Sequence, residues 1–418
     1  MFEHLTNESP LPLSLYLHIP FCHVHCTYCA FNIATRAEAY IPAYVAAMVN
    51  ELRLLGQVPQ APIHTIYFGG GTPSLLSTEQ VSQIITACCD SFVVSPDAEI
   101  TLEANPESLS TNYLAALRAA GVNRLSIGMQ SARPEDLHLF ARQHDLNDVS
   151  LAVRGARKAG FTNVSLDLIY GVPGQTLAAW RESLEAALAL GPDHLSLYAL
   201  SLEQGTALNR AVERGWKLRP DDDLAADMYE LADGLLSDTG LAQYEISSWA
   251  RPAAQARHNL QYWRNLPYLG VGAGAHGYAA GLRYEVVRPF KQYIEHAAAQ
   301  ENPLPFPLTE TVERVEPIDL RTAMSEHMIT GLRLLDEGIS IPGFQARFGV
   351  PIEAVFGPAL ERLVDYGMLY TCENSIRLTQ RARLVSNQVF VYFMPEPTDQ
   401  PESLALVNSG ESTDVYHV

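Results

Sequence analysis

Cysteine is scarce in this 418-residue sequence, with six positions in all, and their placement does not suggest a disulfide framework. Cys88 and Cys89 are adjacent in a helix-like stretch, and Cys372 stands alone. Adjacent and isolated thiols are typical of a reducing compartment, since disulfide-rich proteins belong to oxidising ones. We therefore expect a cytoplasmic protein.

Long apolar runs and positive charge are also in short supply. No segment approaches the run of about 18 apolar residues that a transmembrane helix needs, and the N-terminus lacks the pattern of a secretory signal. Only 28 Lys and Arg oppose 47 Asp and Glu, which gives a net charge of −19. Nucleic-acid affinity depends on clustered Lys and Arg, so we expect no nucleic-acid partner. Peripheral membrane association stays open, although no basic amphipathic segment indicates it.

Three of the six cysteines form a compact motif, Cys22-x₃-Cys26-x₂-Cys29. Three thiolates on one short loop can bind three irons of a [4Fe-4S] cluster and leave the fourth iron open for a ligand. The alternative is a zinc site completed by His23 or His25, but structural zinc sites usually take their ligands from two separated pairs. The spacing therefore favours a cluster with one free coordination position.

Short apolar, β-branched runs alternate with helical patterns along the first half of the chain. Runs at 13–19, 64–68, 99–104, 124–128, 164–169 and 194–200 predict strands, and the segments 38–55, 78–89, 112–120, 147–159 and 177–190 predict helices. Such βα units in series predict a parallel sheet. We expect an α/β fold, a partial (β/α)₆ TIM-like barrel.

The rest of the chain predicts a second, smaller unit. Residues 319–393 predict a helix, a short helix, a further helix at 355–366 and a β-hairpin, which is a winged-helix-like α+β order. The predicted organisation is an N-terminal extension at 1–12, the barrel at 13–245, a Trp/Tyr/Gly-rich extension at 246–302, a proline-punctuated linker at 303–317, the C-terminal domain at 318–394 and a disordered tail at 395–418.

Polar residues recur where the predicted strands end. Glu103, Gln130, Arg142 and Asp167 lie at or just past these ends, and ligands of parallel α/β sheets bind at this edge. Carboxylates, an amide and a guanidinium suit the hydroxyl groups and charges of a zwitterionic nucleoside. Tyr16 either points into the same mouth or packs in the barrel with its hydroxyl satisfied.

A glycine-rich segment follows the second predicted strand and contains Gly70, Gly71 and Thr72. It lacks the Lys-Ser/Thr ending of a P-loop, which argues against a nucleotide-phosphate site. Glycines without a Cβ allow a close approach to an amino-acid-like ligand, although such a segment is also a common turn.

A second unusual cluster is His258-Asn259-x-x-Tyr262-Trp263. On a helix, His258 and Tyr262 share one face, and Asn259 and Trp263 share the next. An imidazole can bind heme iron, but a histidine among aromatics is more often a packed structural residue. Spacing alone favours packing.

Taken together, these motifs resemble those of radical S-adenosylmethionine proteins of the coproporphyrinogen III oxidase-like group. The resemblance rests on the cysteine motif after Tyr-x-His-Ile-Pro, and on Gly-Gly-Gly-Thr-Pro, Glu-Ala-Asn-Pro, Ser-Ile-Gly-Met-Gln-Ser and Asp-Leu-Ile-Tyr-Gly-Val-Pro-Gly-Gln-Thr. Within the group it is most similar to the HemW heme chaperones. Phe31 stands where the HemN oxidases have a further cysteine, and the His258 segment matches the H-N-x-x-Y-W motif associated with HemW and heme.

The resemblance implies three bound groups, which are a [4Fe-4S] cluster, S-adenosyl-L-methionine and heme. It implies Cys22, Cys26 and Cys29 as cluster ligands, His258 as the heme contact, and as adenosylmethionine contacts Tyr16, Gly70, Gly71, Thr72, Glu103, Gln130, Arg142 and Asp167. The expected function is heme delivery to apo-hemoproteins of the respiratory chain, with a homodimer as a further possibility. The alternative is a radical enzyme, such as an oxygen-independent coproporphyrinogen III oxidase, that acts on a tetrapyrrole.

Overall fold

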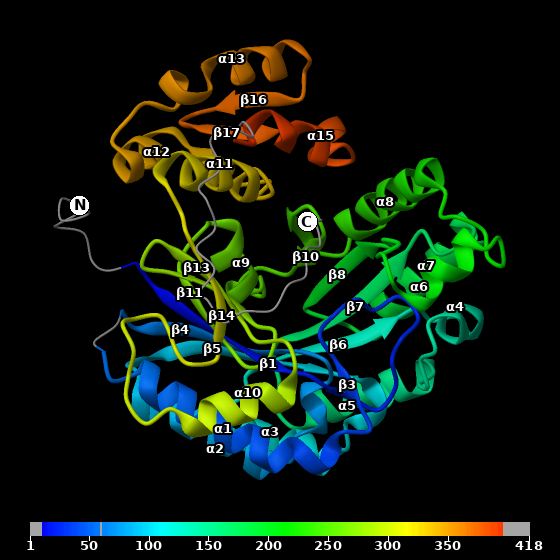
Figure 1. Cartoon of the computed structure of the whole chain (residues 1–418). Helices are drawn as coiled ribbons and strands as arrows, with labels where there is room; N and C mark the ends of the chain where they lie inside the picture. Colours follow the sequence, from blue (N-terminus) through cyan, green and yellow to red (C-terminus); the bar gives the residue numbers. More distant parts are fainter. Residues whose placement is uncertain (1–10, 59–60, 396–418) are drawn as a thin grey trace.

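The structure, a computed structural model, describes residues 11–58 and 61–395, and a curved sheet of twelve strands dominates it. Six of these strands are parallel neighbours in the order β1-β4-β5-β6-β7-β8. They are β1 (Leu13–Ile19), β4 (Ile63–Gly70), β5 (Val94–Ala104), β6 (Arg124–Gln130), β7 (Val164–Tyr170) and β8 (His194–Ala199). Each overlaps a strand predicted from the sequence, and the partial barrel is confirmed (Figure 1).

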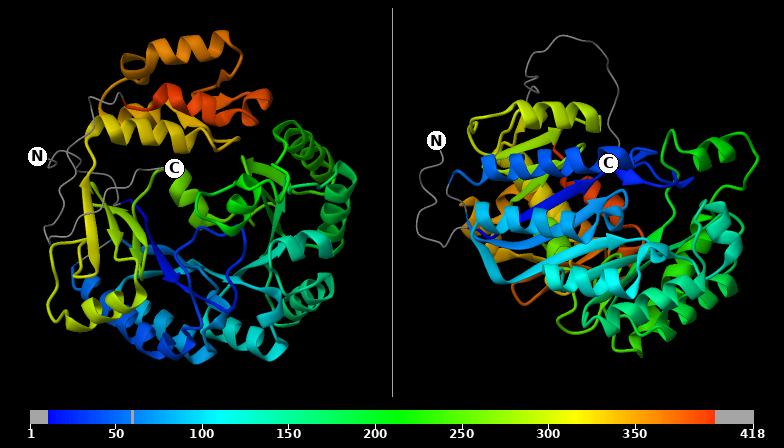
Figure 2. Two further views of the ribbon diagram at one scale, coloured as in Figure 1. Left: turned by 45° about the vertical axis from the view of Figure 1, so that its right-hand side comes forward. Right: turned by 90° about the horizontal axis from the view of Figure 1, so that it is seen from below.

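Helices cover the outer face of the curved sheet, so that the strands form an open ring with the helices outside (Figure 2, left). Local signals set their ends: Ser77 and Gln80 form a capping box at the start of α2, and Gly121 ends α3 in a left-handed conformation. The covering helices are α1 (Ile41–Leu55), α2 (Thr78–Ser91), α3 (Thr111–Ala120), α4 (Pro134–Leu139), α5 (Leu146–Lys158), α6 (Leu177–Ala189), α7 (Ala207–Glu213) and α8 (Asp222–Ser237).

Strand β1 lies in the interior of the sheet and is covered on both faces. Leu15, Leu17 and Ile19 are fully buried, and the alternate positions Tyr16 and His18 belong to the other face of the strand. This alternation directs the polar side chains of the first strand toward the inside of the barrel.

Both edges of the parallel sheet are extended by shorter strands. The strand β11 (Tyr268–Val271) pairs with β1, and β12 (His276–Ala279), β13 (Leu282–Val286) and β14 (Val312–Pro317) continue the sheet beyond it in antiparallel fashion. Residues 312–317, placed in a linker by the sequence analysis, thus form an edge strand. The remaining elements are β2 (Phe21–Cys22), β3 (Ala34–Thr35), β9 (Ala242–Glu245), β10 (Ser248–Ala250), α9 (Arg257–Trp263) and α10 (Phe290–Ala299).

The C-terminal part has its own core around Met328, Phe344 and Phe356 and a small three-stranded sheet in the order β15-β17-β16. It contacts the barrel side through Trp263, because the Arg333 guanidinium lies 4.2 Å from the centroid of that ring. Its elements are α11 (Leu320–Gly331), β15 (Ile339–Ser340), α12 (Ile341–Phe348), α13 (Ile352–Asp365), β16 (Leu369–Cys372), β17 (Ser375–Leu378), α14 (Gln380–Arg383) and α15 (Ser386–Phe390). This order confirms a small α+β domain of winged-helix type.

The predicted limits of the six segments stay predictions. The extension at 1–12 and the tail at 395–418 fall almost wholly outside the described residues. None of the described helices combines the length and the apolar character needed to cross a membrane.

Candidate functional site

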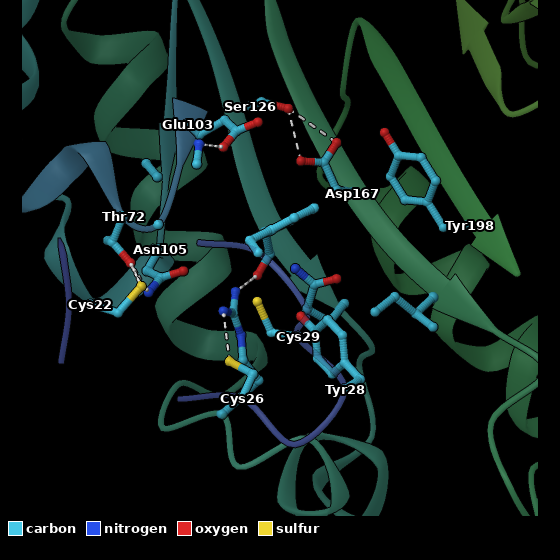
Figure 3. Close-up of a pocket in the computed structure, with 18 of the residues that line it drawn as sticks. Cys22, Cys26, Tyr28, Cys29, Thr72, Glu103, Asn105, Ser126, Asp167 and Tyr198 are labelled. Carbon is cyan, nitrogen blue, oxygen red and sulfur yellow. Dashed lines mark hydrogen bonds between the residues drawn. The ribbon is translucent and has the colours of Figure 1, made fainter. Parts of the chain in front are cut away.

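A cavity of about 680 Å³ opens at the carboxyl ends of the parallel strands. It brings together residues from the loops after β1 and β4 and from the ends of β5, β6 and β7 (Figure 3). Of the residues predicted to contact the cluster or adenosylmethionine, Tyr16 alone does not line the cavity. The ten that do are Cys22, Cys26, Cys29, Gly70, Gly71, Thr72, Glu103, Gln130, Arg142 and Asp167. The expectation that residues at the ends of the parallel strands lie together is confirmed, and their roles as ligands stay predictions.

The cysteine loop is anchored at several points along its length. The Ala34 amide donates to the Pro20 carbonyl at 2.6 Å, the Thr27 hydroxyl donates to the Leu139 carbonyl at 2.7 Å, and the Asn32 side-chain amide donates to the Ala273 carbonyl at 2.9 Å. These bonds tie the loop to β3, α4 and the segment after β11. The three thiols are held in a defined place rather than on a loose loop.

The sulfur atoms of the loop have polar partners. Cys22 Sγ lies 3.3 Å from the Thr72 hydroxyl, and Arg142 Nη1 donates to Cys26 Sγ at 3.7 Å. Burial raises the pKa of the Cys22 thiol to about 11, opposed by the Thr72 hydrogen bond, and burial also raises the pKa of Cys29. Metal binding displaces thiol protons, and the Arg142 guanidinium is placed to offset the charge that results.

The donor set fits a cluster. All three cysteines are free thiols that line one cavity. Among the described residues, no group of three or more His, Cys, Asp or Glu side chains is arranged around a single metal ion. The three thiolates would each bind a different iron of a [4Fe-4S] cluster, so a cluster does not require the three sulfurs to meet at one point.

Two half-buried carboxyl groups, Glu103 and Asp167, line the cavity. Glu103 accepts hydrogen bonds from the Tyr67 hydroxyl at 2.7 Å and from the Gly70 amide at 3.2 Å. Burial raises its pKa to about 7, which these two hydrogen bonds oppose and the nearby charge of Asp167 assists. Burial also raises the pKa of Asp167, although the Ser126 hydroxyl donates to it at 2.8 Å. The pair can accept hydrogen bonds from ribose hydroxyls or from a cationic ligand.

An amide at the end of β6 and a guanidinium in the loop between α4 and α5 line the same cavity. Gln130 has a positive φ of 62°, an uncommon conformation for a residue with a Cβ. Arg142 Nη2 donates to the Gly128 carbonyl at 2.8 Å, and its buried Nε has no hydrogen-bond partner in the described part of the chain. The Arg142 Nε–H is therefore a donor without an acceptor, and a ligand carboxylate would satisfy it.

Gly70 requires the absence of a side chain. Its φ is +108°, and an added Cβ would lie 2.6 Å from the ring of His18. Its conformation lets the backbone amide reach Glu103 at 3.2 Å. The glycine-rich segment is thus both a turn and part of the cavity wall.

Two predicted residues, Tyr16 and His258, do not line the cavity. The Tyr16 hydroxyl bonds with His18 Nδ1 at 3.1 Å. His258 is 1 % exposed, and both of its ring nitrogens are engaged, Nδ1 with the Thr65 hydroxyl at 2.7 Å and Nε2 with the Tyr262 hydroxyl at 2.8 Å. Burial lowers the pKa of His258 to about 3, so the ring is neutral.

Several cavity residues were not among the ligand contacts named from the sequence. Tyr67, Asn105, Ser126, Tyr198 and Asn259 all line the cavity. Strand alternation would have found Ser126, which lies on the same strand face as Gly128 and Gln130. Asn259 belongs to the predicted motif around His258, but it is this asparagine, and not the histidine, that faces the cavity.

Comparison with known proteins gives a consistent result along the chain. Residues 16–187 match the Radical SAM superfamily, and residues 318–385 match the HemN C-terminal domain. "Heme chaperone HemW" of Bacillus subtilis is 37 % identical over 385 residues, which cover 92 % of this chain and 99 % of the relative. The protein of the same name from Escherichia coli is 33 % identical over 387 residues, with 92 % and 99 % covered.

A solved structure shows the same fold. Coproporphyrinogen III oxidase (HemN) from Escherichia coli superposes with a TM-score of 0.80 at 24 % identity, over 93 % of this chain and 91 % of that one. At this identity the likeness concerns the fold alone. The near-complete coverage of the HemW relatives is more informative, because it spans both the barrel and the C-terminal domain. The chain therefore belongs to the HemW family within the radical SAM superfamily.

Proposed function

We propose that this protein is a heme chaperone, which binds heme and delivers it to apo-hemoproteins. The observation that carries the proposal is the similarity to "Heme chaperone HemW" of Bacillus subtilis, at 37 % identity over 99 % of that protein. The cysteine motif also supports the chaperone proposal. Phe31 stands two places after Cys29, at the position where the HemN oxidases have a further cysteine.

Superfamily membership implies a [4Fe-4S] cluster and S-adenosylmethionine. Cys22, Cys26 and Cys29 would hold the cluster, and the cavity wall of Glu103, Gln130, Arg142 and Asp167 would hold the nucleoside. In this family the reduced cluster supplies an electron that can cleave the sulfonium of adenosylmethionine. The protein's own residues orient the ligand: Glu103 and Asp167 accept its hydrogen bonds, and Arg142 offers the donor that its carboxylate needs.

The partners of the proposed function follow from heme transfer. We propose acceptor apo-hemoproteins, respiratory-chain proteins among them, a cytoplasmic location with peripheral membrane contact, and a homodimer as the assembly. The six free thiols support a reducing compartment. His258 remains a predicted heme contact, and in the described conformation it would have to release Thr65 or Tyr262 before it could bind iron.

The alternative activity is oxidative decarboxylation of coproporphyrinogen III. An anaerobic assay of the full chain with a reconstituted cluster distinguishes the heme chaperone from the oxidase. We expect stoichiometric heme uptake, seen as a Soret band, and transfer to an apo-hemoprotein. Formation of protoporphyrinogen from coproporphyrinogen, with adenosylmethionine and a reductant present, would contradict the chaperone proposal.

A further inference from the structure

His23 forms an exposed pair with a carboxylate beside the cysteine loop. Its Nδ1 lies 3.0 Å from Glu38 Oε1, and its side chain is 62 % exposed. The Nε2 atom on the other side of the ring has no hydrogen-bond partner among the residues that the structure describes. Histidines that bind metals typically donate one ring N–H to a carboxylate and present the other nitrogen to the metal.

His23 also lines the cavity, and it shares that lining with several apolar side chains. Val24, Phe31, Ile33 and Leu200 line the same cavity, and Phe31 is 69 % exposed. An exposed phenylalanine that lines a cavity together with other apolar side chains indicates a contact surface for an apolar ligand. The surface and the free imidazole nitrogen together suit a planar apolar ring with a metal at its centre.

Of the four histidines His23, His25, His194 and His258, only His23 both lines the cavity and pairs one ring nitrogen with a carboxylate while the other has no hydrogen-bond partner in the described chain. His194 lines the cavity, but its ring nitrogens bond with the Ser165 and Tyr244 hydroxyls at 2.8 and 2.9 Å. His25 is on the same loop as His23, but it does not line the cavity, and its Nε2 bonds with the Cys29 carbonyl at 3.1 Å. His258 is buried with both nitrogens engaged.

We infer that Nε2 of His23 is an axial iron ligand for a heme that lies on the apolar side chains lining the cavity, with Glu38 orienting the imidazole. The inference rests on the proposed function, because heme is the metalloporphyrin that a heme chaperone carries. When Nδ1–H of the imidazole is donated to Glu38, Nε2 is the nitrogen whose lone pair can bind iron. The heme face would cover Phe31 and remove its ring from water.

The test is a heme titration of the full chain with its cluster, followed by absorption spectroscopy, with hemin as the probe. We expect His23→Ala to weaken heme binding at least tenfold and to shift the Soret band, because an axial ligand is lost. Added imidazole should restore the wild-type spectrum of this variant, which a merely structural role would not allow. Glu38→Gln should weaken binding by about tenfold, the lower end of the range for partners that orient a metal ligand.

His25→Ala is the matched control, since it removes an exposed imidazole from the same loop and should leave binding within twofold. Iron and sulfide contents are measured on every variant, because His23 adjoins Cys22. A His23→Ala protein with wild-type affinity and spectrum would overturn the inference while leaving the chaperone proposal intact. Wild-type protein that takes up no heme would overturn both.

Discussion

The ring of Tyr67 stacks on the ring of His258, with ring centroids 4.8 Å apart and planes inclined by 24°. Tyr67 lines the cavity and donates its hydroxyl hydrogen bond to Glu103, whereas His258 does not reach the cavity. His258, on α9, thus lies behind Tyr67, where it bonds with Thr65 of β4 and with Tyr262 of its own helix. This arrangement predicts that substitution of His258 lowers the stability of the fold.

We expect His258→Ala to lower the free energy of unfolding by about 2–5 kcal/mol, since it removes the hydrogen bonds to Thr65 and Tyr262 and opens a cavity. Urea denaturation measures this loss. Asn259→Ala is the neighbouring control, because its side chain faces the cavity and has no hydrogen bond within the described chain. A His258→Ala protein of unchanged stability that has lost heme would instead support direct heme ligation by His258.

The elevated pKa of Glu103 predicts a pH dependence of stability. In the unfolded chain this carboxyl ionises at about 4.5, and in the folded protein at about 7, chiefly because it is buried. Between these values the folded state binds more protons, so the Glu103 contribution to the free energy of unfolding falls as pH rises from about 4.5 to 7. The full effect is about 3 kcal/mol, at about 1.4 kcal/mol for each unit of pKa.

The difference between the wild type and Glu103→Gln isolates this effect, since other buried carboxyls are present in both. We expect the variant to gain stability relative to the wild type between pH 5 and 8, measured by urea denaturation without adenosylmethionine. Glu203→Gln removes an exposed carboxylate from the same cavity and should show no comparable trend. A difference that stays constant with pH would show that Glu103 is ionised throughout.

Much of the barrel could be predicted because its strands carry local signals. The first strand was predicted with the limits that the structure gives, Leu13–Ile19, since its apolar run is bounded by prolines. The edge strand β14 was not predicted. Prolines around it suggested a linker, and its pairing with β13 depends on a register that no local pattern encodes.

Long-range polar contacts were equally hidden from sequence reasoning. Glu51 lies in a predicted helix and is 1 % exposed, with hydrogen bonds from Tyr293 at 2.7 Å and Thr309 at 2.9 Å. Its partners are more than 240 residues away in the chain. The position of His258 relative to the cavity was hidden in the same way. Spacing predicted that His258 packs on a helix face, but it could not show that Tyr67 would separate His258 from the cavity.

The three cysteines of the loop should be individually necessary for the cluster. We expect Cys22→Ser, Cys26→Ser and Cys29→Ser each to reduce anaerobically reconstituted iron and sulfide from about four per chain to well below one, because three thiolates are the minimum set in this motif. Cys89→Ser is the control, since Cys89 is an exposed thiol on α2. Full iron content in any of the three variants would exclude that thiol as a ligand.

The hydroxyl of Thr72 should set the reduction potential of the cluster. It lies 3.3 Å from Cys22 Sγ and accepts a hydrogen bond from the Asn105 side-chain amide at 3.4 Å, which leaves its own proton free for the sulfur. A hydrogen bond to a ligating sulfur stabilises the reduced cluster, because reduction adds negative charge. Thr72→Val should therefore lower the midpoint potential, and a tenfold change in the reduction equilibrium is about 59 mV for one electron.

Thr72→Ser keeps the hydroxyl and should keep the potential, which separates the hydrogen bond from the volume of the side chain. The measurement is a redox titration followed by electron paramagnetic resonance, without adenosylmethionine, because Thr72 is also a predicted contact of that ligand. Equal potentials in Thr72→Val and the wild type would show that the contact with Cys22 does not persist once the cluster is bound. A shift in Thr72→Val alone assigns the tuning to this one hydroxyl, since the two variants differ in little else at the sulfur.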